Sequence, residues 1–190
     1  MLYLLNLDYA LTSFFNQIIA HNIFFNYLFS FLSLKGSSIF IWILVIIIVV
    51  ILEERKNPGI SKRDKKFIFL FLLSFLVTYF LSDLVLKNIF LRPRPFIGSG
   101  NPTPTQFFCP FDFSFPSTHA ATAFVAAEIL AYFNKKRKWF YFAVAILISY
   151  SRIYLGCHYF FDVVFGAIIG WLVSQSLLFV LGTSPSRKKS

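Results

Sequence analysis

Charged residues are scarce in this sequence: they make up 14% of its 190 residues, whereas 57% of the residues are hydrophobic. In soluble domains about a quarter of the residues are charged, so a water-soluble fold of this size lacks the polar surface that it needs. The same composition excludes a disordered chain and a collagen-like chain. The apolar residues stand in unbroken blocks without the alternation of membrane β-strands, which excludes a β-barrel. What remains is an integral membrane protein built of helices.

Cysteine is almost absent as well. Cys109 and Cys157 are the two cysteines of the chain, and no Cys-x-x-Cys pair occurs. This pattern excludes a zinc ribbon and a dithiol redox centre. Residues 1–9 contain no Lys or Arg, and no small-residue cleavage site follows them, so we expect no removable signal peptide.

Five apolar blocks are long enough to cross about 30 Å of hydrocarbon as helices. They are residues 37–52, 67–91, 117–133, 139–156 and 159–181. Residues 9–34 repeat apolar residues at helical spacing against a polar face, which favours an interfacial helix or a polar-faced crossing, with a possible break at His21 and Asn22. We expect a sixth crossing there. The predicted fold is all-α, a polytopic membrane helix bundle of about six transmembrane helices, in one membrane-embedded domain over residues 1–190.

The basic residues predict how the bundle is oriented. Of the 18 Lys and Arg residues, six lie in residues 53–66, four in 134–138 and three in the tail 182–190. These segments are alternate connections of the bundle, so they share one side of the membrane, and the positive-inside rule makes that side cytoplasmic. The connection 92–116 and the short turn near 156–158 then face outward. The connection is rich in Pro and Phe, which is typical of a functional or packed loop.

Five cations remain outside this cytoplasmic set: Lys35, Lys87, Arg92, Arg94 and Arg152. The predicted topology brings three of them, Lys87, Arg94 and Arg152, towards the outer face. The histidines His119 and His158 join them there. A cluster of cations and imidazoles at a membrane face is costly without an anion to bind. The sequence therefore predicts an anion-binding site on the outer side.

The local patterns predict what this site does. His158 and Asp162 are four residues apart at the start of a helix, so the carboxylate can accept the Nδ1 proton and leave Nε2 nucleophilic. The step from Pro116 to Ser117 opens a helix whose free N–H groups and dipole favour a phosphate. His119 in its first turn can protonate a leaving oxygen.

Pro93 and Pro95 end the preceding helix and present two arginines from extended backbone. Guanidinium groups suit bidentate contacts with phosphate. Arg94 is part of the predicted cluster, whereas Arg92 is either a spare cation for a second phosphate or an anchor to lipid headgroups.

Three segments carry a family pattern. KNIFLRPRP (87–95) has Lys, six residues, then Arg-Pro; FPSTH (115–119) has Pro-Ser-x-His; and SRIYLGCHYFFD (151–162) has Ser-Arg, five residues, His, three residues, Asp. Together and in this order they resemble the signature of the type 2 phosphatidic acid phosphatase superfamily. That superfamily includes undecaprenyl-diphosphate, phosphatidylglycerophosphate and lipid A phosphatases and the vanadium haloperoxidases. The resemblance runs from about residue 80 to residue 175.

The resemblance implies a role for each of these residues. His158 is implied to be the nucleophile that forms a phosphohistidine, with Asp162 orienting it and His119 acting as general acid and then base. The implied phosphate-binding residues are Lys87, Arg94, Ser117, Thr118 and Arg152. The resemblance also implies a reaction with no metal and no other cofactor. Thr118 stands where glycine is commonest in the family, which places the fine geometry or the substrate preference in question.

Other polar residues have plainer expected roles. Asp83 is four residues before Lys87 and is expected to pair with it along the helix. Glu128 lies well below the site, where a buried partner within the bundle is as reasonable as a function. A disulfide between Cys109 and Cys157 is compatible with the topology, since both face outward.

The predicted function is hydrolysis of a lipid phosphate or diphosphate at the outer face of the cell membrane. Undecaprenyl diphosphate is the preferred substrate, giving undecaprenyl phosphate and phosphate, with phosphatidylglycerophosphate and lipid A as alternatives. An alternative of another class is a non-catalytic lipid-binding or transport protein of the same fold. The expected partners are the lipid substrate and the bilayer. Nucleic acid is excluded, because the cations divide between two membrane faces and no soluble binding domain exists.

Overall fold

The computed structural model describes residues 2–33, 37–54, 62–95 and 109–181. All the regular structure in these residues is helical. The elements are α1 (Leu2–Gln17), α2 (Ile23–Ser33), α3 (Ser37–Glu54), α4 (Lys62–Tyr79), the π-helix η1 (Phe80–Leu86), α5 (Lys87–Phe90), α6 (Thr118–Phe133), the 3-10 helix η3 (Lys135–Arg137), α7 (Lys138–Tyr154) and α8 (Phe160–Leu181). The predicted all-α bundle is confirmed. The predicted basic tail 182–190 and the middle of the predicted outer loop lie outside the described residues.

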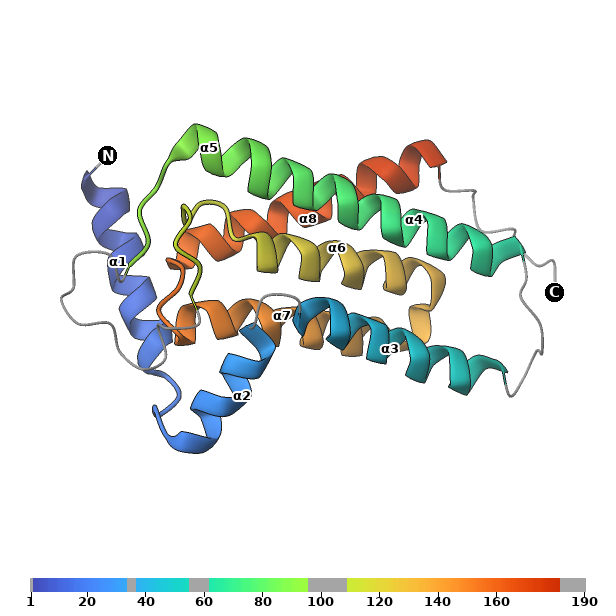
Figure 1. The fold of residues 1–190 in the computed structure, drawn as a ribbon, viewed down its shortest axis with the longest axis horizontal. Coiled ribbons are helices and arrows are strands. Elements are labelled where there is room, and N and C mark those ends of the chain that lie inside the picture. The colour runs from blue at the N-terminus through green and yellow to red at the C-terminus, as the bar shows by residue number, and fades with distance from the viewer. Residues whose placement is uncertain (1, 34–36, 55–61, 96–108, 182–190) are drawn as a thin grey trace.

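Five long rods run along the long axis of the molecule (Figure 1). They are α3, α4 with its continuation through η1 and α5, α6, α7 and α8, and they correspond to the five predicted spans. The central rod is α6, which packs against α4, α7 and α8. Two of the described rods, Lys62–Phe90 and Phe160–Leu181, are long and apolar enough to cross a membrane by length and composition.

The bundle keeps small side chains inside and large apolar ones outside. The buried face of α6 is a row of alanines: Ala120, Ala121, Ala123, Ala126, Ala127 and Ala131. Large apolar side chains are instead exposed around the bundle, among them Phe69, Leu72, Leu76, Ile146, Leu172 and Phe179. Soluble proteins bury such side chains, whereas helices in lipid gain nothing from hiding them and associate through small residues. The packing is therefore that of helices surrounded by lipid.

Two glycines on α8 allow it to lie directly against α6. A Cβ atom at Gly166 would meet the carbonyl oxygen of Ser117 at 2.5 Å, and one at Gly170 would meet that of Ala121 at 2.2 Å. The obstacles are backbone atoms, so no side-chain movement relieves them. The four-residue spacing puts both glycines on one face of α8, as in close-packed membrane helices. This contact fixes the first turn of α6 against α8.

Replacing Gly170 by leucine is expected to separate α6 from α8 and to lower the melting temperature in detergent. Overpacking of this kind costs about 1–3 kcal/mol or more, because the added side chain has no space. The measurement is thermal unfolding followed by intrinsic fluorescence. Ile168→Leu is the matched control, since Ile168 is exposed on the same helix. Equal melting temperatures for the two variants would contradict the close packing.

Residues 9–34 belong to two helices rather than one. α1 ends at Gln17 and α2 begins at Ile23, so the chain breaks around His21 and Asn22, as one interpretation of the sequence suggested. α1 lies at one end of the bundle, at a steep angle to the long axis (Figure 1). α2 has 11 residues and spans roughly 16 Å, about half of the hydrocarbon thickness. The segment in which a sixth crossing is expected therefore consists of two short helices with the break between them.

The two ends of the bundle differ in chemistry. One end, which we call the site end, holds α1, α2, the α7–α8 turn (155–159) and the described parts of the α5–α6 connection (91–95 and 109–117) (Figure 1). The opposite end holds the turn between α6 and α7 and the start of α4. Its exposed cations include Lys62, Arg63, Lys65, Lys135, Lys136 and Lys138. This separation agrees with the predicted grouping of basic connections on one side.

Candidate active site

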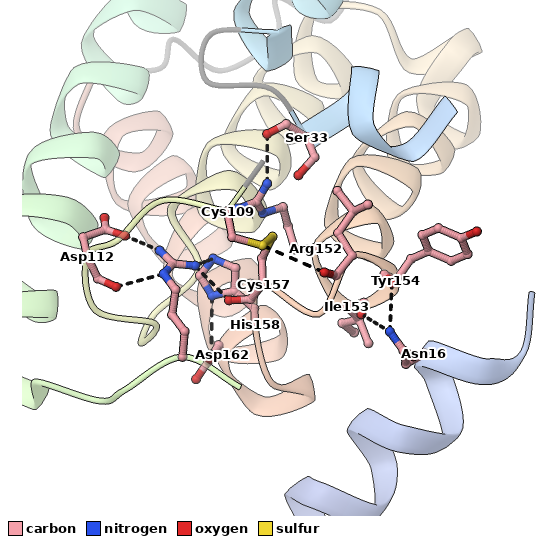
Figure 2. The surroundings of a disulfide bond; sticks show 12 residues. Asn16, Ser33, Cys109, Asp112, Arg152, Ile153, Tyr154, Cys157, His158 and Asp162 are labelled. Carbon is pink, nitrogen blue, oxygen red and sulfur yellow. Dashed lines mark hydrogen bonds and ion pairs between the residues drawn. A yellow bond between two sulfur atoms is a disulfide. The ribbon is translucent and has the colours of Figure 1, made fainter. Parts of the chain in front are cut away.

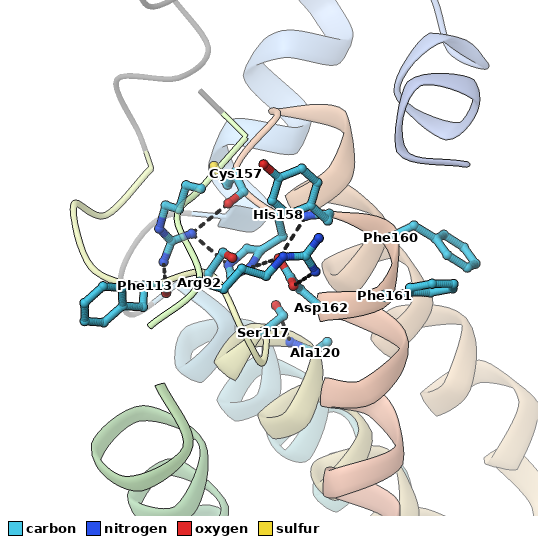
Figure 3. A network of polar contacts seen from close by, with 12 residues as sticks. Arg92, Phe113, Ser117, Ala120, Cys157, His158, Phe160, Phe161 and Asp162 are labelled. Atoms are coloured by element: carbon cyan, nitrogen blue, oxygen red, sulfur yellow. Dashed lines mark hydrogen bonds and ion pairs between the residues drawn. The ribbon is translucent and has the colours of Figure 1, made fainter. Parts of the chain in front are cut away.

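His158 lies in the turn between α7 and α8, where it is 1% exposed. Its Nδ1 lies 3.5 Å from Oδ2 of Asp162, the pairing that the four-residue spacing predicts (Figure 3). On the other side of the ring, Nη1 of Arg94 lies 2.9 Å from Nε2. Since a guanidinium can only donate, Nε2 accepts this hydrogen bond and the ring proton resides on Nδ1, towards Asp162. The lone pair of Nε2 therefore faces the cations.

The surroundings of His158 keep its ring neutral. Burial lowers the pKa of His158 well below 6.5, and the charges of Arg94, Arg152 and Lys87 lower it further. A neutral imidazole offers a lone pair at Nε2, which an imidazolium lacks. The site thus presents an uncharged imidazole among fixed positive charges.

This lowered pKa makes the stability of the fold depend on pH. Above about pH 6.5 the His158 ring is neutral in both the folded and the unfolded chain, so it contributes no pH dependence. Below that value the unfolded chain takes up a proton that the folded chain does not, so stability falls as the pH falls. We expect the melting temperature to drop more between about pH 7.5 and 5.5 in the wild type than in His158→Gln. Parallel curves would contradict the buried neutral ring.

Lys87 and Arg94 meet at one carboxylate of the α5–α6 connection. Nζ of Lys87 contacts Asp112 and also Asp83, the latter at 2.6 Å, which confirms the predicted pairing along the helix. The Arg94 guanidinium, 1% exposed, contacts Asp112 as well. Burial acts to raise the pKa of Asp112, but the hydrogen bond from Lys87 and the charges of Arg94 and Lys87 outweigh it and hold that pKa below 3.8. An ionised carboxylate therefore rests on two of the predicted phosphate-binding cations.

Arg152, near the end of α7, is fully buried at the site end. Its Nη1 donates to the carbonyl oxygen of Ser33 at 2.9 Å (Figure 2). Its Nε and Nη2 have no hydrogen-bond partner among the residues that the structure describes. A buried guanidinium with unused donors is costly, and an anion is the ligand that would satisfy it.

Arg92 differs from what its sequence context suggested. Its Nη1 and Nη2 lie 2.6 Å from Oδ1 of Asp162 and Oδ2 of Asp8, and its guanidinium stacks over the ring of Tyr159. Two carboxylates therefore engage its charge, one from the pair with His158 and one from α1. Neither the spare cation for a second phosphate nor the headgroup anchor matches these contacts. The sequence could not predict these contacts of Arg92, because Asp8 and Asp162 are both remote from it in the chain.

The first turn of α6 begins as its sequence predicts. Ser117 is the N-cap, its hydroxyl accepts from the N–H of Ala120 at 3.4 Å, and its own N–H donates to the carbonyl of Asp162 at 2.9 Å (Figure 3). Thr118 donates to Asp83 at 3.1 Å, so its side chain joins the carboxylate that holds Lys87. His119 lies in the same turn, half-buried. Helix-terminal N–H groups, two hydroxyls and an imidazole thus gather at the site end.

A disulfide between Cys109 and Cys157 links the α5–α6 connection to the residue before His158 (Figure 2). The sequence left this bond open, and the structure contains it. Since Asp112 follows three residues after Cys109, the disulfide holds that carboxylate near His158. Away from the site, Glu128 accepts a hydrogen bond from Gln175 of α8 at 3.3 Å, the partner within the bundle that one interpretation expected.

Two residues of the site escaped the sequence analysis. Asp112 lies in the α5–α6 connection. The one feature of the sequence that could have indicated its role is that it is the single acidic residue in a segment rich in Pro and Phe. Asp8 lies outside the family pattern, but it is one of eight acidic residues in a membrane chain and begins the row Asp8, Thr12, Asn16. Such an intramembrane carboxylate at helical spacing with other polar residues indicates a partner within the fold.

Comparison with known proteins covers the segment that contains the site. A family model described as the PAP2 superfamily matches residues 67–184, which contain every predicted site residue. An undecaprenyl-diphosphatase of Sulfolobus acidocaldarius is 31% identical over 164 residues, which are 86% of this chain and 74% of that protein.

Two solved structures share the fold. The crystal structure of Aquifex aeolicus LpxE has a TM-score of 0.63 and 28% identity, and covers 91% of this chain and 95% of that one. A transmembrane PAP2-type phosphatidylglycerolphosphate phosphatase from Bacillus subtilis has a TM-score of 0.64 and 23% identity, over 97% and 90% of the two chains. The latter likeness concerns the fold alone.

Proposed function

The chain belongs to the PAP2 superfamily, and from this premise we propose that it hydrolyses a lipid phosphate or diphosphate through a phosphohistidine at Nε2 of His158. The family match, together with a relative named as an undecaprenyl-diphosphatase, supports a lipid phosphatase over the alternative of a non-catalytic transport or lipid-binding protein. The contact that carries the proposal joins Nη1 of Arg94 to Nε2 of His158 at 2.9 Å. It sets a positive charge beside the nucleophilic lone pair, and when Arg94 gives this donor to a phosphate oxygen instead, the lone pair is free to attack phosphorus.

The phosphate binds among Lys87, Arg94 and Arg152. Arg152 contributes Nε and Nη2, which lack partners in the described part of the chain. When the substrate binds, its phosphate oxygens displace the carboxylate of Asp112 from Lys87 and Arg94, so that one anion is exchanged for another. Ser117, Thr118 and the N–H groups of the first turn of α6 supply further donors.

The reaction proceeds in two displacements. Nε2 of His158 attacks phosphorus in line with the leaving oxygen, forming a P–N bond as the P–O bond to the lipid breaks. His119 gives its proton to that oxygen, and Asp162 stabilises the positive charge that develops on the His158 ring. His119 then takes a proton from a water, whose oxygen attacks phosphorus and breaks the P–N bond. Phosphate leaves, and His158 is again neutral.

Undecaprenyl diphosphate is the substrate that we propose, with undecaprenyl phosphate as the leaving group. The support is the undecaprenyl-diphosphatase of Sulfolobus acidocaldarius, whose similarity extends over 86% of this chain. Phosphatidylglycerophosphate and lipid A are the alternatives within the same chemistry. The mechanism uses side chains for every step, so it calls for no metal and no other cofactor.

Phosphate release by the purified protein in detergent tests the function. The substrates are undecaprenyl diphosphate, phosphatidylglycerophosphate, lipid A and phosphatidic acid, each with EDTA present. We expect the highest kcat/KM on undecaprenyl diphosphate and no loss of rate with EDTA. No release above the level of His158→Ala on any substrate would refute the function, and dependence on an added divalent metal would refute the phosphohistidine route.

We also propose that residues 1–190 form one membrane-embedded domain of the cell membrane, with the site end on the extracytoplasmic side. The support is the clustering of exposed cations at the opposite end of the bundle. A site at the outer leaflet receives its lipid from the side, with the tail in the bilayer and the phosphate against the cations.

Cysteine labelling tests this orientation. Lys136 lies in the short turn between α6 and α7, at the end of the bundle that we propose to be cytoplasmic. In intact cells, Lys136→Cys is therefore expected to resist a membrane-impermeant maleimide. Asn88→Cys is the matched control, since Asn88 is exposed near the site end, and we expect it to react. Labelling at position 136 with protection at position 88 would invert the topology.

A further inference from the structure

A polar row on α1 faces the turn that contains His158. Asp8, Thr12 and Asn16 follow one another at intervals of four residues, which places them on one side of the helix. Asp8 is 1% exposed although it is charged. The proposed chemistry assigns none of the three a role, and they lie before the segment that matches the family.

These side chains cap the two helices that flank His158. Asp8 and Thr12 accept hydrogen bonds from the N–H groups of Phe161 and Phe160, both at 2.9 Å, in the first turn of α8. Asn16 donates to the carbonyl oxygens of Ile153 and Tyr154, both at 2.8 Å, at the end of α7 (Figure 2). Helix ends leave such backbone groups without partners inside the helix. α1 therefore supplies caps for the end of α7 and the start of α8 together.

Asp8 also connects α1 to the nucleophile by charge. Its Oδ2 lies 2.6 Å from Nη2 of Arg92, and Nη1 of Arg92 lies 2.6 Å from Oδ1 of Asp162. Oδ2 of the same Asp162 accepts from the N–H of Tyr159 at 3.0 Å and faces Nδ1 of His158 (Figure 3). The chain of contacts runs from Asp8 through Arg92 and Asp162 to the imidazole.

The charges in this chain restrain one another. Asp8 and Asp162 would repel in a buried site, and the guanidinium of Arg92 bridges them. With both carboxylates in place, Arg92 is held at two points and stacks over Tyr159, so the orientation of Asp162 is fixed. Without the charge of Asp8, Arg92 keeps one carboxylate and is free to move with it.

We propose that Asp8 is a positioning residue for the phosphatase reaction: through Arg92 it holds Asp162 in the orientation that keeps the His158 ring aimed at phosphorus. The inference rests on the proposed function, since it concerns the alignment of the same nucleophile. It assigns α1 a part in the active site rather than a merely anchoring role in the membrane.

Asp8→Asn separates this role from capping. The asparagine Oδ1 still accepts from the N–H of Phe161, but the side chain no longer carries the charge that holds Arg92. We expect kcat to fall by about 10- to 100-fold with KM within about twofold, because a misplaced nucleophile slows the chemistry and leaves phosphate binding intact. Asp8→Glu is expected to restore part of kcat. Ser13→Ala is the matched control, since Ser13 is exposed on the same helix.

A double-mutant cycle tests whether Asp8 acts through Arg92. In an Arg92→Gln background, Asp8→Asn is expected to cause little further loss of kcat, because the link is already broken. Independent, additive losses would overturn the proposal. A loss of kcat in Asp8→Asn that is matched by a lower melting temperature and not restored in Asp8→Glu would mark a structural role and also overturn it.

The effect of Asp8 on His158 can also be measured without catalysis, which separates the test of this inference from the test of the proposed function. In 15N-histidine-labelled protein, the Nδ1 and Nε2 signals of His158, assigned with His158→Gln, are expected to shift in Asp8→Asn and to stay in place in Ser13→Ala. If the wild type releases no phosphate from any lipid, the proposed function fails while this shift still tests the link. Unchanged His158 signals in Asp8→Asn would overturn the inference even in an active enzyme.

Discussion

Replacing His158 by alanine is expected to lower kcat by at least about 10³-fold on every lipid substrate, because the variant lacks the atom that attacks phosphorus. We expect KM to change little in this variant, because the cations that bind phosphate remain, so KM does not report the loss of the nucleophile. The direct measurement is the covalent intermediate. Wild type mixed with 32P-labelled substrate and quenched in alkali should carry label that is stable to base and lost in acid, as a phosphohistidine requires, and His158→Ala should carry none.

The companion variant His119→Ala distinguishes the two displacements. With 4-nitrophenyl phosphate, whose leaving group needs no proton, the phosphohistidine still forms, but the water that breaks it has no base. We therefore expect labelled His119→Ala to accumulate, whereas wild type turns over. Label on His158→Ala, or equal label on wild type and His119→Ala, would contradict the assignment of nucleophile and base.

The sequence was sufficient to pair His158 with Asp162 because the two are only four residues apart, at the turn that leads into α8. His158 lies in the turn just before α8 and Asp162 in the first turn of that helix, so their closeness is local. The five spans follow from apolar blocks long enough to cross the hydrocarbon of a membrane. Convergence of Lys87, Arg94 and Arg152 followed from topology alone, since alternate helix ends share a membrane face.

The contacts of Arg92 were out of reach for the opposite reason. Its partners, Asp8 and Asp162, come from α1 and α8, and no local spacing relates the three. The orientation of α1 was equally undetermined, because an amphipathic pattern states which face is polar and leaves open what that face contacts. From the sequence alone, the polar row Asp8, Thr12, Asn16 is equally compatible with a face exposed to water. Only the structure shows that this row contacts the α7–α8 turn.

Replacing Arg152 by methionine is expected to move activity and stability in opposite directions. In the free protein this guanidinium is fully buried, its Nη1 has the carbonyl of Ser33, and its Nε and Nη2 have no partner in the described part of the chain. Substitution of a buried charge by an apolar side chain of similar length is often neutral or stabilising by about 1–4 kcal/mol. The melting temperature of Arg152→Met should therefore equal or exceed that of wild type in the same detergent.

The same substitution removes donors that we propose to bind the phosphoryl oxygens, which hold the negative charge in the transition state, so kcat/KM is expected to fall about 10²- to 10³-fold. Added phosphate should raise the melting temperature of wild type by more than that of Arg152→Met, since the variant keeps Lys87 and Arg94 but lacks the unused donors of Arg152. Lys138→Met is the control, because Lys138 is an exposed cation at the other end of α7. If Arg152→Met instead unfolds at lower temperature and keeps its activity, the residue serves to hold Ser33 and α2 in place. Opposite changes in stability and activity would mean that the fold keeps an unsatisfied buried charge because the phosphate completes it.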